Sequence, residues 1–218
     1  NELMNSIAGD LTGAEAYRDV ARLLDVVNFV DYLLLNIYAA TWDWPNNNWT
    51  AARERRPGAR FRFYVWDAEG TFGTSAKDYP YNTIREDLEA LNDEIPRIYR
   101  ALSVNEDFRR LFSSRAAVHF GGHGALTDSN VLLQAEELRR TLAEAIPFNL
   151  GTPRILTWIE HRGYRMLTHM QEAGLLVPVD PFAPAQPSFH APSIPVPLAP
   201  ASGPNLDETG AVDAKDLL

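Results

Sequence analysis

Apolar residues recur at helical spacing through the first forty positions of the chain. Between residues 13 and 24 they fall three or four positions apart, which predicts an amphipathic helix. The next run, residues 26–41, is apolar on nearly every side and predicts a central helix buried all round. Asp25, at the junction, is predicted to cap the start of this second helix with its side chain.

The pattern changes after the central helix. Pro45 and three neighbouring asparagines break the helical spacing, so Trp42–Thr50 is predicted to be a loop packed under its own tryptophans. Arg60–Trp66 alternates and is rich in aromatic residues, which predicts a strand. We expect this strand to pair with one near Trp49–Arg53, so that the loop lies at one end of a short hairpin.

Helical spacing returns in the second half of the chain. The expected helices lie near residues 83–101, 103–119, 127–147 and 154–173. Ser103 and Glu106 have the spacing of a capping box, and Thr127 or Asp128 is predicted to cap the third of these helices. One apolar stripe runs along that helix through Val131, Ala135, Leu138, Leu142 and Ile146. The expected fold is therefore α+β and mostly α.

The composition changes again beyond residue 177. Nine of the fifteen prolines lie between Pro178 and Pro204, and the last dozen residues are polar and acidic. Such a segment is predicted to be an extended linker or a tail that wraps the body. We therefore expect one main domain over residues 1–177 and a proline-rich tail over residues 178–218.

Composition narrows the possible functions. A net charge of −9 argues against a general nucleic-acid-binding protein and against residence on an anionic membrane surface. The absence of cysteine excludes disulfides, thiolate nucleophiles and cysteine-bound metal clusters. No stretch approaches the roughly 20 apolar residues that a membrane span needs. Because residue 1 is not methionine, we expect the chain to be a fragment of a longer protein.

Three polar residues around the predicted hairpin indicate phosphoryl transfer. Asp43 is followed after five positions by Asn48, and after nineteen more by Asp67 at the expected end of the second strand. In protein kinases an aspartate meets the acceptor hydroxyl, an asparagine five residues later binds magnesium, and a later aspartate followed by Phe-Gly binds the metal and phosphates. Here Phe72-Gly73 stands five residues after the last aspartate.

Each of these residues also has a purely structural interpretation. Alone, Asp43 would be a turn residue before Pro45. Together with Asn48 and Asp67 it is better explained as a catalytic or metal-site residue, because a carboxylate buried between tryptophans is costly unless a cation meets it. Glu69 is expected either to assist the metal or to serve in a turn.

Several other polar residues are expected to be structural. Asp31 is predicted to orient the loop through a hydrogen bond to Trp42 or Trp49. His119 and His123 are interpreted as turn residues, because two glycines between them interrupt any helix that could present both to zinc. Asn46 and Asn47 are also expected in turns. The basic cluster is expected to be a solvated hairpin tip, with contact to an acidic substrate or a phosphate as the alternative: Arg53, Arg55 and Arg56.

The motifs of the chain resemble those of the CotH family of spore-coat-type atypical kinases. The resemblance covers roughly residues 15–180. It rests on four segments: Asn28-Phe-Val-Asp-Tyr32, Asn36-Ile-Tyr38, Trp42-Asp-Trp-Pro-Asn-Asn-Asn-Trp49 and Trp66-Asp-Ala-Glu-Gly-Thr-Phe-Gly73. Weaker similarity continues to the end of the expected domain.

The resemblance implies a kinase-like C-terminal lobe that uses ATP and Mg²⁺ or Mn²⁺ to phosphorylate protein serine or threonine. It implies that Asp43 is the catalytic aspartate and that Asn48 and Asp67 are the metal ligands. Glu69, where many relatives have a second aspartate, joins them in cofactor binding. The N-terminal lobe of the family is expected in another part of the same protein, and the location is expected to be extracellular or in the cell envelope.

Two other functions are compatible with the same residues. The first is a cell-surface or envelope adhesion module that keeps the fold without catalysis, which the glutamate at position 69 favours. The second is a glycosidase in which Asp43 and Asp67 are the two carboxylates, although this leaves Asn48 without a role.

Overall fold

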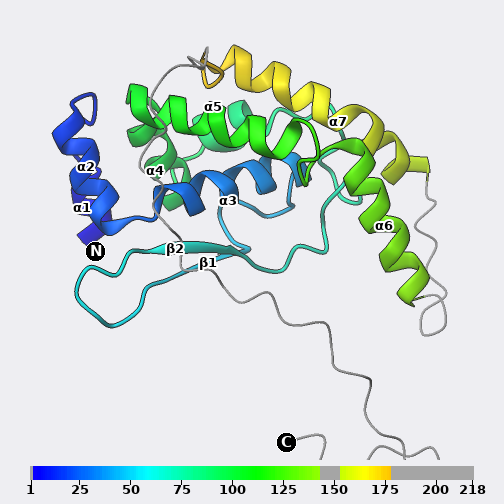
Figure 1. Cartoon of the computed structure of the whole chain (residues 1–218), viewed down its shortest axis with the longest axis horizontal. Coiled ribbons are helices and arrows are strands. Elements are labelled where there is room, and N and C mark those ends of the chain that lie inside the picture. Colours follow the sequence, from blue (N-terminus) through cyan, green and yellow to red (C-terminus); the bar gives the residue numbers. More distant parts are fainter. Residues whose placement is uncertain (1, 143–152, 178–218) are drawn as a thin grey trace, which may run out of the picture. The chain divides into compact units, whose positions relative to one another are not determined.

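A computed structural model describes residues 2–142 and 153–177 of the chain. Within these ranges the helices pack to one side of a single antiparallel pair of strands, which confirms the predicted α+β, mostly α class (Figure 1). The elements are α1 (Glu2–Ser6), α2 (Ala14–Leu23), α3 (Val26–Ala39), β1 (Trp49–Ala52), β2 (Arg62–Val65), the π-helix η1 (Ile84–Glu89), α4 (Glu94–Ser103), α5 (Glu106–Phe120), α6 (Asp128–Leu142) and α7 (Pro153–Glu172).

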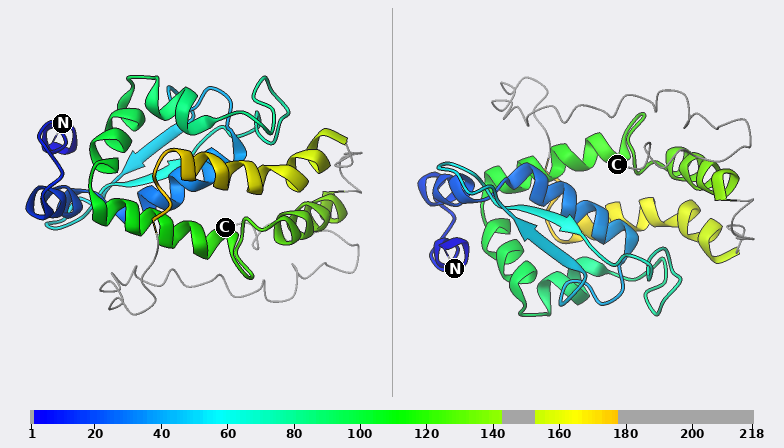
Figure 2. Two further views of the ribbon diagram at one scale, coloured as in Figure 1. Left: turned by 90° about the horizontal axis from the view of Figure 1, so that it is seen from above. Right: turned by 90° about the horizontal axis from the view of Figure 1, so that it is seen from below.

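The central element is α3, which lies between the hairpin and the helices α5 and α7 (Figures 1 and 2). Phe29, Leu33 and Ile37 on this helix are fully buried, as its continuous apolar sequence predicts. Asp25 caps the helix: its carboxylate accepts a hydrogen bond from the Asn28 amide N–H at 3.1 Å. Both predictions for this segment are confirmed.

The predicted hairpin is present, and α3 holds it directly. β1 and β2 pair antiparallel, with Trp49 opposite Val65. The side chain of Asn28 accepts a hydrogen bond from the Phe63 N–H at 2.6 Å and donates one to the Phe63 carbonyl at 3.2 Å. An amide side chain thus pairs with β2 as a neighbouring strand would, and it fixes the hairpin against the central helix.

The single helix predicted over residues 83–101 is wrong: two elements, η1 and α4, occupy this range. Residues 90–93 separate them, and Pro96 lies in the first turn of α4. Proline has no N–H to donate to a preceding helical turn, and it is tolerated where those donors are unpaired in any case. Pro96 is therefore compatible with the start of a helix and not with the middle of a longer one.

The predicted capping box is also wrong. Ser103 is the last residue of α4, and its hydroxyl donates to the Arg100 carbonyl at 3.1 Å. Asn105 is the N-cap of α5, because its side-chain oxygen accepts from the Asp107 and Phe108 amides. Its side-chain N–H₂ group donates to the Leu11 carbonyl at 2.7 Å. An amide has both a donor and an acceptor, so it serves the cap and a distant loop together.

The last two helices agree with their predicted starts. Thr127 is the cap of α6, since its hydroxyl accepts from the Asn130 N–H at 3.4 Å. The apolar stripe of this helix is only partly covered: Val131 packs against the core, whereas Leu138 is 51% exposed. Residues 143–147 of the predicted helix lie outside the described residues. α7 matches the predicted 154–173 within one residue at each end.

Two further predictions concern the whole chain. Among residues 2–142 and 153–177, no helix is long and apolar enough to cross a membrane. The predicted tail, residues 178–218, lies outside the described residues, so the domain boundary at residue 177 stays a prediction.

Candidate active site at the base of the hairpin

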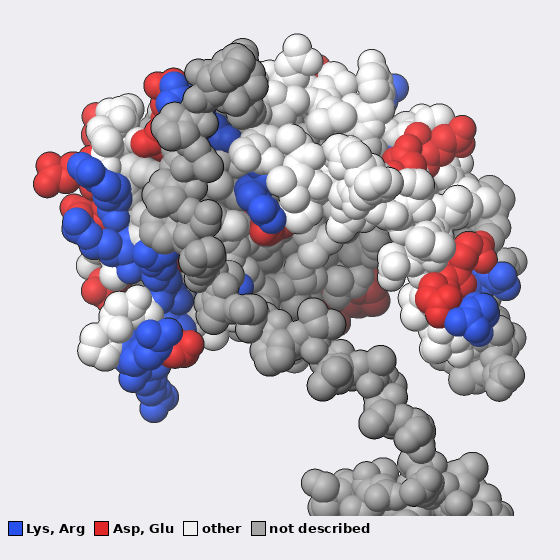
Figure 3. All heavy atoms as spheres, viewed as in Figure 1, with Lys and Arg blue, Asp and Glu red and all other residues white. Residues whose placement is uncertain are grey.

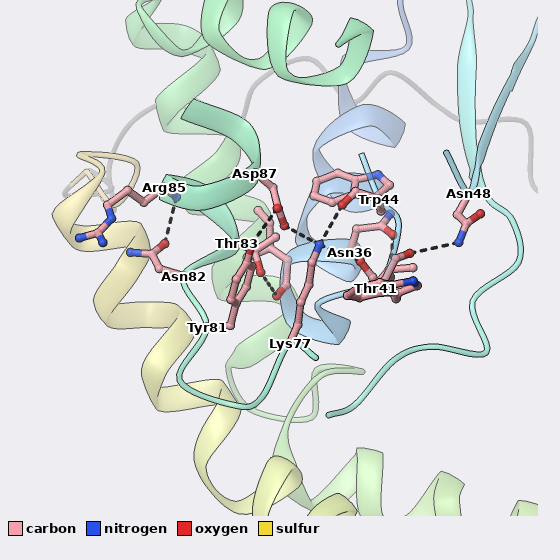
Figure 4. Close-up of polar contacts among 12 residues, drawn as sticks. Asn36, Thr41, Trp44, Asn48, Lys77, Tyr81, Asn82, Thr83, Arg85 and Asp87 are labelled. Carbon is pink, nitrogen blue, oxygen red and sulfur yellow. Dashed lines mark hydrogen bonds and ion pairs between the residues drawn. The ribbon is translucent and has the colours of Figure 1, made fainter. Parts of the chain in front are cut away.

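Asp43, Asn48 and Asp67, here called the site trio, lie in two loops at one end of the hairpin. Asp43 is in the loop between α3 and β1, Asn48 immediately precedes β1, and Asp67 follows β2 by two residues. The two loops are in contact, because the Asn48 side chain donates to the Asp67 carbonyl at 3.0 Å and to the Trp42 carbonyl at 3.1 Å. Figure 4 shows Asn48 at the start of the strand, pointing toward the first loop.

The two bonds of Asn48 decide which of its side-chain atoms is left for a ligand. Both acceptors are carbonyl oxygens, so the side-chain nitrogen must face them and both of its N–H groups are used. The remaining group is the oxygen Oδ1. Amide and carboxylate oxygens are the ligands that Mg²⁺ and Mn²⁺ prefer.

The backbone of all three members of the site trio is left-handed. The φ angles are 58° at Asp43, 58° at Asn48 and 51° at Asp67. Left-handed backbone is uncommon for residues other than glycine, although aspartate and asparagine adopt it more readily than most. Such strained conformations cluster at active sites and ligand clamps. Ala40 and Phe72 also have left-handed backbone, at φ 45° and 53°. The coincidence of this backbone with the three residues singled out by spacing makes the base of the hairpin a candidate functional site.

The carboxylate of Asp43 is exposed, so the expectation that tryptophans bury it is wrong. Trp44 is the buried tryptophan of the loop, whereas Trp42 is 49% exposed. The indole N–H of Trp44 donates to the Tyr32 hydroxyl at 2.6 Å on α3, which turns this ring into the core and leaves the preceding residue at the surface. Asp43 accepts one hydrogen bond from the Asn47 side chain at 3.0 Å.

Negative charge at the site is not neutralised by neighbouring side chains. Across the described part of the chain, Asp43, Asp67 and Glu69 form no ion pair, and all three are exposed. Within residues 2–142 and 153–177, the hydrogen bond of Glu69 is made by its carbonyl, which accepts from the Thr74 hydroxyl at 3.4 Å. Exposed carboxylates without a cationic partner can receive a metal ion or a hydroxyl proton.

A close backbone approach joins the two loops next to the site trio. The Trp42 N–H donates to the Gly70 carbonyl at 2.8 Å. A Cβ atom at position 70 would lie 2.8 Å from the Cβ of Trp42, closer than such atoms approach in proteins. Gly70 is therefore required for the close approach of the two loops. The sequence around it does not have the pattern of a phosphate-binding loop.

A metal at this site would rely on few protein ligands. Among the described residues, no group of three or more His, Asp or Glu side chains is placed to hold a metal ion. Mg²⁺ in phosphoryl-transfer enzymes is commonly bound through one or two carboxylates, with substrate phosphates and waters completing its shell. The donor set of Asp67 and the Asn48 oxygen fits that mode and does not fit an all-protein cage.

Buried polar residues of α3 support the first loop from below. Asn36 donates to the Tyr32 carbonyl at 3.0 Å and accepts a bond from the Thr41 hydroxyl at 3.0 Å. Burial raises the pKa of the Tyr32 hydroxyl well above its ordinary value, so it stays neutral beside Trp44. Residues of the quoted Asn-Phe-Val-Asp-Tyr and Asn-Ile-Tyr segments thus position the loop that presents Asp43.

Sequence reasoning missed two buried cations, Lys77 and Arg162. Lys77 donates hydrogen bonds to the Thr41 carbonyl, the Trp44 carbonyl and the Asp87 carboxylate. Arg162 on α7 donates to the Tyr38 carbonyl at 3.0 Å and to the Tyr81 carbonyl at 2.6 Å, and burial lowers its pKa to about 10. One signal was available: the chain has eighteen arginines but only two lysines, Lys77 and Lys215.

Asp31 does not contact Trp42 or Trp49, contrary to the prediction. Its carboxylate forms a bidentate pair with Arg115 on α5, at 2.6 and 2.8 Å, and lies 2.9 Å from His119. His119 is therefore a helical residue with a structural partner and not a turn residue. The reason is the side of α3 on which Asp31 lies: it faces α5 and not the loop.

The arginine cluster lies at the other end of the hairpin. Arg53 pairs with Glu2 at 3.0 Å, and Arg56 pairs with Glu54. The arginines line a shallow hollow of about 400 Å³ with Arg22 and the 54–59 turn. In Figure 3 basic side chains gather over this end of the molecule, as expected for a solvated tip.

Comparison with known proteins agrees with the motifs. Residues 1–163 match the family described as CotH kinase protein, which is three quarters of the chain. The fold and site therefore belong to a kinase-related domain. The chain is a member of the CotH kinase protein family. No curated protein and no solved structure matches it.

Proposed function

We propose that the protein is an atypical protein kinase that transfers the γ-phosphoryl group of ATP to serine or threonine of a protein substrate. One observation carries the proposal: the Asn48 side chain joins the loop of Asp43 to the loop of Asp67, and all three residues have left-handed backbone. Phosphoryl transfer asks mainly for positioning and for electrostatic stabilisation, and this geometry supports both.

Each member of the site trio has a proposed role. Asp43 is exposed and without a cationic partner, so its carboxylate is available to accept the proton of an acceptor hydroxyl. Asp67 and the free oxygen of Asn48 would hold Mg²⁺ or Mn²⁺, which neutralises the phosphate charge when bound. Glu69 adds a further carboxylate two residues from Asp67 and would contact the same cofactor.

Family membership supports the remaining parts of the proposal. A kinase cleft binds its nucleotide between two lobes, and we infer that an N-terminal lobe of the same protein supplies the second wall. The association of the family with spore coats supports an extracellular or envelope location and a protein substrate found there. No nucleic acid is expected as a partner, in keeping with the net charge of −9.

The direct test is phosphate incorporation from labelled ATP, measured with the full-length gene product. Asp43→Asn and Asp67→Asn are each expected to reduce incorporation by at least about a hundredfold, the lower range for loss of a positioned acid–base or charge-stabilising group. Asp78→Asn is the matched control, because this exposed aspartate lies in the same segment but outside the site trio. Incorporation near the wild-type level in either site variant would contradict the assignment.

A further inference from the structure

Lys77 and Asp87 form a buried ion pair directly below the loop that presents Asp43. The distance from Lys77 Nζ to Asp87 Oδ2 is 2.8 Å, and both residues are buried. Lys77 belongs to the 67–83 segment that follows Asp67, and Asp87 lies on η1. Figure 4 shows the lysine between the π-helix and the loop residues. The pair therefore connects the segment after Asp67 with η1, and both lie next to the loop of Asp43.

The lysine also holds the loop itself. Its ammonium group donates to the Thr41 carbonyl at 3.0 Å and to the Trp44 carbonyl at 2.9 Å. These carbonyls belong to the residues on either side of Trp42-Asp43. An ammonium has three N–H donors, and here two go to the loop and the third goes to Asp87. Every donor of Lys77 is used, and two of them fix the backbone around the catalytic candidate.

The carboxylate of Asp87 is satisfied at both oxygens. Oδ2 accepts from Lys77, and Oδ1 accepts from the Tyr81 hydroxyl at 2.9 Å. The ammonium also lies 5.3 Å from the centre of the Tyr81 ring. Burial raises the pKa of the Asp87 carboxyl, whereas the bonds from Lys77 and Tyr81 oppose that rise. Asp87 therefore has a partner at both oxygens, and the two remaining bonds of Lys77 both go to carbonyls of the loop.

The identity of the cation matters. Lysine is a compact charge with three donors in a tetrahedral array, whereas arginine presents a planar fork. Thr41, Trp44 and Asp87 approach one nitrogen from three directions, which suits the ammonium. The chain uses arginine at eighteen positions and lysine at two, so a lysine at this point is a departure from its general usage.

A buried ion pair is weak evidence of a stabilising role, because a protein in which well-packed apolar residues of similar volume replace the pair is often equally stable. The pair does have a geometric consequence. The other supports of the loop are Asn36 below Thr41 and Tyr32 below Trp44, both on α3. The neutral hydrogen bonds of Trp42, from its N–H to the Gly70 carbonyl and from the Asn48 side chain to its carbonyl, add to them. Only Lys77 connects the loop backbone to the segment that follows Asp67 through a charged side chain, among the contacts recorded for the described residues.

We propose that Lys77, held by Asp87, is a positioning residue that sets the placement of Asp43 relative to the loop of Asp67. The inference rests on the proposed kinase function for its effect on catalysis. Lys77 reaches no reacting atom, and it acts through the Thr41 and Trp44 carbonyls. A displacement of about 1 Å at a reacting group can cost a hundredfold in rate, so losing this tie should lower kcat.

The test compares the double substitution Lys77→Met/Asp87→Leu with wild type. Removing both charges leaves no unpaired buried ion, so the fold is expected to survive better than with Lys77→Met alone. We expect kcat for phosphate transfer to fall about a hundredfold, with KM for ATP changed less than about threefold. Hydrogen exchange measured by mass spectrometry should accelerate in residues 41–49 and stay unchanged in α5.

A matched control is the pair Arg115→Met/Asp31→Leu. It also removes an ion pair that ties a helix to α3, but it does not touch the loop. The control is expected to leave both kcat and exchange in residues 41–49 at wild-type values. If the Lys77/Asp87 double variant does not fold, Lys77→Arg replaces it: the charge stays, the three-way geometry is lost, and the same fall in kcat is expected.

The outcomes separate the inference from the proposed function. Wild-type kcat and exchange in a folded Lys77/Asp87 variant, or in Lys77→Arg, would overturn the inference. If the wild-type protein transfers no phosphate, the proposed function fails. In that case exchange in residues 41–49 decides alone: acceleration supports a tie between Lys77 and the loop, and an unchanged rate refutes it.

Discussion

The two ends of the hairpin handle charge in opposite ways. At the tip, exposed arginines pair with nearby glutamates, as Arg53 does with Glu2. At the base, the carboxylates of Asp43 and Asp67 form no ion pair within the described residues, and the backbone that holds them is left-handed. Lys77, below the loop of Asp43, is buried: it pairs with Asp87 and not with Asp43 or Asp67, and its other two donors bind backbone carbonyls.

This difference is what we expect if the charges at the tip serve solubility and those at the base bind a ligand, as proposed. Exposed ion pairs such as those at the tip contribute little, typically about 0–1 kcal/mol. Carboxylates left unpaired on a strained backbone gain nothing for the fold, and such backbone costs roughly 1–3 kcal/mol per residue. The residue types at the base fit metal and phosphate binding, which is the role proposed for them.

Among the substitutions that test this difference between the two ends, replacing Asn48 is expected to have the largest effect on stability and phosphate transfer. Asn48→Gly removes both bridging bonds and the free oxygen, while glycine adopts the left-handed backbone without strain. We expect a loss of roughly 1–2 kcal/mol in stability, from two hydrogen bonds partly offset by relieved strain. Phosphate transfer should fall by about a hundredfold or more.

The matched control is Asn46→Gly, a neighbouring exposed asparagine whose side chain forms no hydrogen bond with the part of the chain that the structure describes. Urea unfolding and labelled-ATP assays on both variants provide the measurements. Equal losses of activity in the two variants would mean that the loop as a whole, and not Asn48, is responsible.

Gly70→Ala should have the next largest effect. The added Cβ would lie 2.8 Å from the Cβ of Trp42, so the two loops must separate. Overpacking of this kind costs about 1–3 kcal/mol, and phosphate transfer should fall roughly tenfold through the displaced loop. Gly9→Ala, where no atom lies within 4 Å of the new Cβ, is the control for stability and activity. Unchanged activity in Gly70→Ala would show that contact between the loops is dispensable.

Substitution at the tip should do almost nothing. Arg55→Ala and Arg56→Ala remove exposed side chains, one of them paired only with Glu54. Neither stability nor kcat should change measurably. Thermal unfolding and steady-state kinetics would show this. A large rise in KM for a protein substrate would instead make the tip a docking surface, which the sequence left as an alternative.

The smallest expected effect is the pH dependence that comes from His169 on α7. Burial, and then the charge of Arg162, lowers the pKa of this histidine below its ordinary value. The unfolded chain therefore binds the proton first as pH falls below about 6.5, and stability declines from there toward the lowered folded-state pKa. His169→Gln should flatten this part of the stability curve. A decline of equal steepness in the variant would assign the effect to other groups.

The sequence predicted those parts of the fold that depend on local pattern. The apolar run of α3, the cap at Asp25 and the alternating strand of the hairpin all follow from periodicity within a short segment. The helix predicted over residues 83–101 was wrong because the pattern is continuous there, while Pro96 restarts the helix. The cap of α5 was wrong because Asn105 is selected by a contact with Leu11, ninety-four positions away.

For the candidate site, too, the sequence predicted some features and not others. Spacing alone singled out Asp43, Asn48 and Asp67, and the structure brings their two loops into contact through Asn48, although their functional roles stay predictions. Spacing did not indicate how they are held: the left-handed backbone, the exposed position of Asp43 and the pair of Lys77 with Asp87 all arise from tertiary packing. A buried lysine is invisible to periodicity, since its burial depends on acceptors from other segments.

The roles assigned to the two aspartates are tested most directly by calorimetric titration of Mn·ATP into the protein as its gene encodes it. The account predicts that Asp43→Asn binds Mn·ATP with an affinity close to wild type yet transfers no phosphate. Asp67→Asn should lose most of the metal-dependent affinity as well as transfer. Equal binding of Mn·ATP by wild type and Asp67→Asn would contradict the account.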